Sequence, residues 1–171
     1  TNLHSAFYNH YFGASAYVGT IYCVGGMNMS LELIDLTDER VMEELKDIIK
    51  EYYVHARSVM GFDKPVKVVL RHDEHNGAKM LGRTGEYDPQ KEKIVIYVAN
   101  RHPKDILRSL SHELVHHTQN CRGDFKNAKM RENGYAQKDE HLREMEREAY
   151  EVGNLCFRDW EDGVKYGSKK N

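Results

Sequence analysis

The sequence predicts an α+β domain, because helical and strand-like hydrophobic patterns both occur along it. Apolar residues recur about every 3.6 residues, as in an amphipathic helix, over 37–60, 103–122 and 142–160. Two short segments between the first two of these stretches, 66–70 and 93–99, are instead rich in β-branched residues. A length of 171 residues with 40% hydrophobic content suffices for one ordinary core. We therefore expect one unit in the order helix, strands, helix, loop, helix.

The first helix is expected to begin at Thr37 and to stop at Gly61. Asp38 and Glu39 suit its first turn, because negative charge is favoured near a helix N-terminus. Its apolar positions share one face: Val41, Leu45, Ile48, Ile49, Tyr52, Ala56 and Val59.

The strand-like segments differ in polarity. VKVVL at 66–70 and KIVIYVA at 93–99 predict strands, the second one buried on both faces. Between them, MLGRTGEYDPQKE is more polar and predicts an antiparallel edge strand with a turn at Asp88 and Pro89. An irregular loop is the alternative for this polar segment.

The segment RHPKDILRSLSHELVHHTQNCRG predicts the second helix, of roughly four to five turns. Pro103 is tolerated in a first helical turn, and Gly123 is a typical residue at a helix end. A polar, aperiodic loop is expected over 125–141, then the last helix over 142–160, and a frayed tail from 161 onward.

Charge divides the chain into residues 1–31, of unknown role, and a domain over residues 32–171. Residues 1–31 contain no Asp, Glu, Lys or Arg. They have no basic start, and Asn, His, Ser and Gly interrupt their apolar residues, so neither a secretory signal nor a membrane span is predicted. A leader, a pro-segment that blocks a cleft and sequence outside the domain remain open for residues 1–26.

Composition narrows the classes of partner. A formal net charge of −2 provides no broad positive field for nucleic acid or for a membrane surface, so we expect neither as a partner. Cys23, Cys121 and Cys156 are few and far apart, which predicts neither a disulfide framework nor a cysteine-type zinc site. We therefore expect a reducing, intracellular location, namely the cytoplasm. The oligomeric state is not indicated.

The candidate metal ligands and a candidate general base lie in the stretch HELVH. Residues four apart on an α-helix differ by only about 40° around its axis, so His112 and His116 can point two imidazoles at one ion. Nitrogen ligands in this arrangement suit Zn²⁺. Glu113 is turned about 100° from His112, so it can instead take a proton from water as a general base.

The two histidines lie off the expected core face of their helix, more than about 90° from its apolar stripe. This position favours a metal clamp over a histidine pair packed in the core. A solvated face is the alternative. His72 and His75 could also bind a metal, but a polar turn is the simpler interpretation.

Catalytic zinc needs a third protein ligand. A metzincin continuation is excluded, because Gln119 and Arg122 stand where it needs Gly and His. On the last helix, Glu146 flanks the apolar stripe at about 60° from its centre and so faces inward. A carboxylate on the packed side of a helix needs compensation, which zinc would provide.

Other assignments remain open from the residues alone. Glu146 could pair with Arg143 or Arg147, and His141 or Glu148 could be the third ligand. Glu144 and Glu151 are expected to face solvent.

The motif HELVH followed by REMEREA resembles the gluzincin metallopeptidases, whose third zinc ligand is a glutamate on a later helix. Arg143, Glu146 and Ala149 are similar to the Arg-x-x-Glu-x-x-Ala arrangement of that helix in small zincins. The resemblance implies Zn²⁺ on His112, His116 and Glu146, with Glu113 as the catalytic base.

The resemblance covers roughly residues 37–160 and extends to minimal zincin-like domains of phage and bacterial genomes. It implies a small antiparallel or mixed twisted sheet packed on the HELVH helix, with an N-terminal helix and a C-terminal glutamate-bearing helix. Thr118 and Tyr150 depart from the residues common in such proteins.

The expected function is therefore zinc-dependent hydrolysis of peptide bonds in a protein or peptide substrate. Tyr135, His141 and His117 are candidates for stabilising a developing oxyanion, and spacing does not choose among them. One alternative is a metal-binding zincin-like sensor or interaction module with little or no turnover. Another resembles zincins that act on DNA–protein crosslinks with a histidine third ligand, which the near-neutral charge disfavours.

Overall fold

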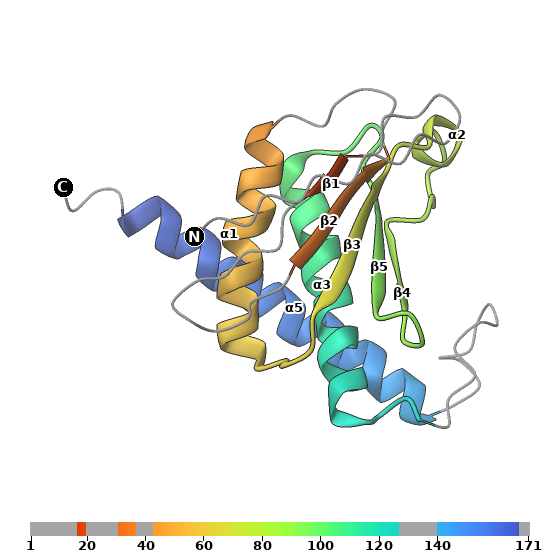
Figure 1. Cartoon of the computed structure of the whole chain (residues 1–171), viewed down its shortest axis with the longest axis vertical. Helices are drawn as coiled ribbons and strands as arrows, with labels where there is room; N and C mark the ends of the chain where they lie inside the picture. The colour runs from red at the N-terminus through yellow and green to blue at the C-terminus, as the bar shows by residue number, and fades with distance from the viewer. Residues whose placement is uncertain (1–16, 20–30, 37–42, 127–139, 168–171) are drawn as a thin grey trace.

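The computed structural model describes residues 17–19, 31–36, 43–126 and 140–167 (Figure 1). A five-stranded mixed sheet has the order β1-β2-β3-β5-β4. The long helices α1, α3 and α5 supply the core against one side of the sheet. The strands are β1 (Tyr17–Gly19), β2 (Leu31–Leu36), β3 (Val66–Arg71), β4 (Gly85–Asp88) and β5 (Lys93–Tyr97). The described helices are α1 (Glu43–Met60), α2 (Glu74–Gly77), α3 (Pro103–Arg122) and α5 (Glu140–Gly167). The α+β class predicted from the sequence is confirmed.

The centre of the sheet is parallel and its two edges are antiparallel. β2, β3 and β5 pair in parallel, while β1 pairs antiparallel with β2 and β4 antiparallel with β5. The polar segment before Pro89 is therefore the predicted antiparallel edge strand, not a loop. β5 is buried on both faces as predicted: Ile94 and Ile96 join the main core, and Val95 joins a smaller cluster of buried residues.

β2 was not predicted, although alternate residues of it are buried. Leu31 and Leu33 join the main core, and the next inward position is Asp35, which is only 4% exposed. Its carboxylate lies 3.4 Å from Lys46 Nζ on α1, and Lys46 is equally buried. A buried ion pair therefore continues the inward row where the pattern of hydrophobic residues stops.

The buried residues of α1 agree with the predicted apolar face, with one exception. Leu45, Ile49, Tyr52 and Ala56 are buried in the core, but the expected apolar position Val59 is 56% exposed. Val59 lies in the last turn of α1, where the adjacent Met60 packs against the core instead. The expected start at residue 37 lies outside the described residues.

α3 begins and ends where its sequence predicts. Pro103 occupies the first turn after His102, whose ring Nδ1 accepts a hydrogen bond from the Lys104 backbone N–H. Gly123 follows the last turn with φ of 88°, a left-handed conformation that glycine adopts without a Cβ clash. The proposed metal-binding residues on this helix therefore lie in its regular interior.

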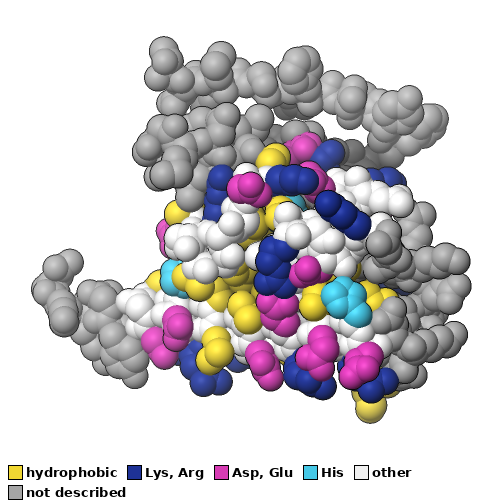
Figure 2. Space-filling model, turned by 90° about the horizontal axis from the view of Figure 1, so that it is seen from below, with side chains coloured by type: hydrophobic (Ala, Val, Ile, Leu, Met, Phe, Trp, Pro, Cys, Tyr) yellow, Lys and Arg dark blue, Asp and Glu magenta, His cyan; other side chains and the backbone are white. Residues whose placement is uncertain are grey.

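α5 is longer than predicted, because it continues to Gly167 where a frayed tail was expected from residue 161. Glu161 accepts from Lys165 at 3.1 Å one turn on and lies 3.1 Å from Lys104 of α3. These pairs support the extra turns. Acidic and basic side chains are intermixed on the molecular face that includes α5 (Figure 2).

The remaining elements are small. His72 precedes α2, a single turn that is capped by Asp73 and contains His75, and His72 Nε2 lies 3.5 Å from Glu74 Oε1. This agrees with a polar turn after β3. Within the described ranges, no helix combines the length and apolar character needed to cross a membrane.

Candidate metal centre

The two histidines of α3 face α5, away from the sheet side of the helix. Leu110 and Leu114 fill the main core, as the predicted stripe requires. His116 is 4% exposed and His112 is half-buried. A solvated histidine face, the alternative from the sequence, is therefore wrong for His116.

Glu146 of α5 lies opposite both rings. Its Oε2 lies 3.2 Å from His112 Nε2, its Oε1 lies 3.1 Å from His116 Nε2, and the two Nε2 atoms are 3.1 Å apart. Among the described residues, these three form the group of histidine, cysteine or acidic side chains placed to hold a metal ion.

The spacing of these atoms fits zinc. Ligands at about 2.0–2.1 Å around a tetrahedral ion lie about 3.3 Å from one another. The distance between the two Nε2 atoms, and the distance from each of them to one Glu146 oxygen, Oε2 for His112 and Oε1 for His116, are within about 0.2 Å of that value. Two imidazoles and one carboxylate also form a donor set that zinc accepts, and they leave a fourth position open. The residues present therefore fit the metal that the motif implies.

Glu113 is buried beside the start of β4. Its side chain is 7% exposed, and a Cβ added to Gly85 would lie 3.2 Å from its Oε1. Burial raises the pKa of the Glu113 carboxyl, and the opposing charges of His116 and His112 do not outweigh this effect. A carboxylate with a raised pKa is a better proton acceptor, which suits a general base.

The cluster attracts positive charge. Burial alone would lower the pKa of His116, but the hydrogen bond to Glu146 and the charges of Glu113 and Glu146 raise it above the usual value. The same carboxylates would stabilise a bound cation.

A close crossing of α3 and α5 brings Glu146 to the histidines (Figure 1). Ser111 Oγ donates to the Gly153 backbone carbonyl at 2.6 Å, and the Tyr52 hydroxyl of α1 donates to the same Oγ. A Cβ added to Gly153 would lie 3.2 Å from the His112 backbone N. The absence of a side chain at Gly153 therefore sets how near the two helices come.

Alanine substitutions at two glycines of α5 test this crossing. Gly163→Ala is expected to stabilise the protein by about 0.5–1 kcal/mol through helix propensity, because a Cβ at this position would meet no neighbouring element within 4 Å. Gly153→Ala gains the same propensity but crowds the α3 backbone, at a cost of about 1–3 kcal/mol. Thermal unfolding measures both variants. Equal stabilisation by the two would show that the crossing tolerates a methyl group.

The alternative third ligands lie elsewhere. His141 is exposed, and its Nε2 donates to the Asp124 backbone carbonyl at 3.0 Å. Glu148 accepts two hydrogen bonds from Arg122, which lower the pKa of its carboxyl. Glu144 and Glu151 are exposed as expected. The structure thus brings Glu146 to the histidine pair and does not bring these residues to it.

His117 has a structural role. Its Nε2 donates to the Lys64 backbone carbonyl at 2.9 Å, so its Nδ1 accepts from the Tyr87 hydroxyl at 2.8 Å. Asn120 Nδ2 in turn donates to that hydroxyl. Burial lowers the pKa of His117. These bonds tie α3 to β4 and engage both ring nitrogens, which removes His117 from the oxyanion candidates.

Three further residues were named from the sequence: Tyr135, Cys23 and Cys121. Tyr135 and Cys23 lie outside the described residues. Cys121 is half-buried with Sγ 3.7 Å from His117 Nε2, and burial raises the pKa of its thiol, so its thiolate fraction is reduced.

Two residues contact the cluster without having been predicted to do so. The Tyr150 ring lies 4.5 Å from the His112 ring, centroid to centroid, and its side chain is 62% exposed. Gln119 Oε1 lies 2.8 Å from His116 Nδ1. Helical spacing could have indicated both, because Tyr150 is four residues after Glu146 and Gln119 three after His116.

Comparisons with known proteins give no match for the chain among family models, curated proteins or solved structures.

Proposed function

We propose that the protein is a zinc-dependent peptidase of the gluzincin type, with zinc held by His112, His116 and Glu146. The observation that carries the proposal is the convergence of the two histidine Nε2 atoms and the Glu146 carboxylate, at separations of 3.1–3.2 Å, with the buried Glu113 next to His112 in the chain. The resemblance of HELVH and REMEREA to that class supports the same assignment.

Zinc in this position would polarise the scissile carbonyl and lower the pKa of water at its open coordination site. Glu113 then accepts the proton of the attacking water and transfers it to the leaving nitrogen. Burial of Glu113, which is 7% exposed, supports both steps, because it separates the proton transfers from bulk water.

The substrate is proposed to be a protein or a peptide. β4 is one of the two edge strands of the sheet, and its first residue, Gly85, adjoins Glu113. An edge strand presents unpaired backbone groups to which an extended chain can add. This position would bring a peptide bond beside the proposed base.

Hydrolysis of casein and of a peptide library tests the proposal. Protein treated with a chelator is expected to be inactive and to regain activity when one equivalent of zinc is added. The zinc-free protein serves as its own control. Zinc binding without product from any substrate would contradict the peptidase and would favour a metal-binding interaction module.

A further inference from the structure

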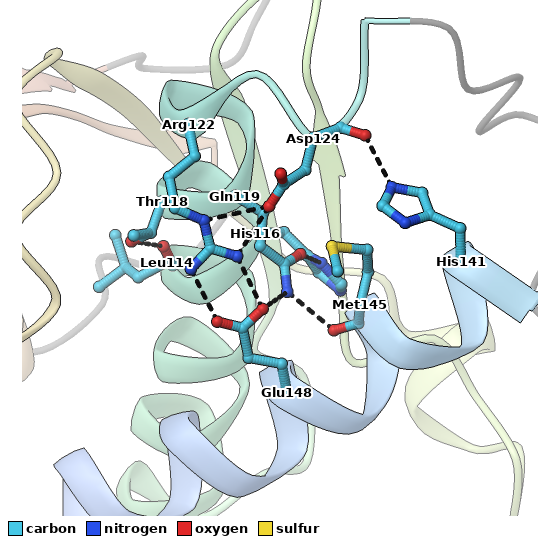
Figure 3. Close-up of polar contacts among 9 residues, drawn as sticks. All are labelled: Leu114, His116, Thr118, Gln119, Arg122, Asp124, His141, Met145 and Glu148. Atoms are coloured by element: carbon cyan, nitrogen blue, oxygen red, sulfur yellow. Dashed lines mark hydrogen bonds and ion pairs between the residues drawn. The ribbon is translucent and has the colours of Figure 1, made fainter.

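A chain of hydrogen bonds runs from the back of the His116 ring to the surface (Figure 3). Gln119 is fully buried, and its Oε1 lies 2.8 Å from His116 Nδ1. Its amide nitrogen donates to the Met145 backbone carbonyl at 2.8 Å and to Glu148 Oε2 at 3.0 Å.

These contacts fix the orientation of the Gln119 amide. Met145 O and Glu148 Oε2 can only accept hydrogen bonds, so the nitrogen of the amide must face them. The oxygen therefore faces His116 and can only accept. It follows that His116 Nδ1 carries a proton and donates it.

The proton on Nδ1 determines the state of the other nitrogen of the His116 ring, Nε2. A neutral imidazole with its proton on Nδ1 has its lone pair on Nε2. His116 Nε2 is the atom that faces Glu146 and His112. The contact with Gln119 thus presets the nitrogen that a metal requires.

Arg122 forms the end of this hydrogen-bond network that is nearest the surface. Its guanidinium donates to both Glu148 oxygens at 2.8 Å and to Asp124 Oδ2 at 2.7 and 3.1 Å. Arg122 and Gln119 belong to α3, while Glu148 belongs to α5. The hydrogen-bond network therefore also joins the two helices that carry the proposed ligands, as the sticks in Figure 3 show.

We propose that Gln119 is a positioning residue for His116, and that Glu148 and Arg122 keep its amide in the orientation that leaves His116 Nε2 free to bind zinc. This inference rests on the metal site of the proposed function but not on peptidase activity. A hydrogen bond to the non-ligating nitrogen of a metal-binding histidine fixes its ring and raises its basicity.

The test is Gln119→Met, which keeps the shape of the side chain but removes the strong acceptor. We expect zinc affinity, measured by competition with a fluorescent chelator, to fall about 10–100-fold. Gln90→Met, at an exposed position between β4 and β5, is the matched control and should bind zinc like the wild type.

A spectroscopic measurement separates positioning from packing. In zinc-loaded, ¹⁵N-labelled protein, the His116 Nδ1–H should give a signal protected from solvent exchange in the wild type and an unprotected one in Gln119→Met. If that variant does not fold, the wild type alone decides, because an unprotected His116 Nδ1–H signal in the zinc-loaded protein would contradict the proposal.

The two proposals fail in different ways. Wild-type protein that binds no zinc would contradict the metal centre itself. Wild-type and Gln119→Met proteins that bind zinc equally would overturn only the role of Gln119.

Discussion

Glu113→Gln is expected to reduce peptide hydrolysis by about 10²–10⁴-fold while zinc remains bound. The amide cannot accept the proton of the attacking water, whereas the carboxylate can. Glu113 is not one of the three converging residues, so its replacement leaves the ligand set intact. Initial rates on a cleaved peptide, with zinc content measured on the same samples, check both parts.

Glu144→Gln is the matched control for this substitution. Glu144 is an exposed glutamate of α5 whose carboxylate pairs with Arg147, one turn on. The variant should retain wild-type rates. Full activity in Glu113→Gln would remove Glu113 from the mechanism even if zinc is present.

Glu146→Ala is expected to weaken zinc binding strongly. Loss of a residue that only supports a ligand typically weakens metal binding about 10–100-fold, and loss of Glu146 should weaken it by more. Two histidines would remain, and they provide neither a third ligand nor the negative charge that offsets the ion. His141→Ala should leave affinity unchanged, because that ring contacts the Asp124 backbone. Competition with a chelator measures both variants.

The opposite pattern of zinc binding in the two variants would change the assignment of the third ligand. Zinc retained by Glu146→Ala and lost by His141→Ala would assign the third ligand to His141. Loss in both variants would point to a general effect on α5, which thermal unfolding of the zinc-free proteins would reveal.

Sequence patterns predicted the features that depend on neighbours along the chain. The helix that carries His112 and His116 follows from its own periodicity and from Pro103 and Gly123 at its ends. Glu146 could be placed toward the core because it flanks a long apolar stripe on one helix.

Features that depend on contacts between distant residues could not be predicted in this way. β2 was missed because its inward row includes Asp35, which is tolerated there through Lys46 of another element. The role of Gln119 depends on Glu148 and Met145 of α5, which come near it only when α3 and α5 cross. Asp35 has no local signal that distinguishes it from an ordinary polar side chain, and for Gln119 helical spacing indicates only that it is near His116.

Zinc content of the purified wild-type protein tests the metal centre most directly. Elemental analysis together with native mass spectrometry should find one zinc per chain, removed by a chelator and restored when zinc is added. Wild-type protein that takes up no zinc at neutral pH, although it is folded, would contradict the assignment of His112, His116 and Glu146 as ligands.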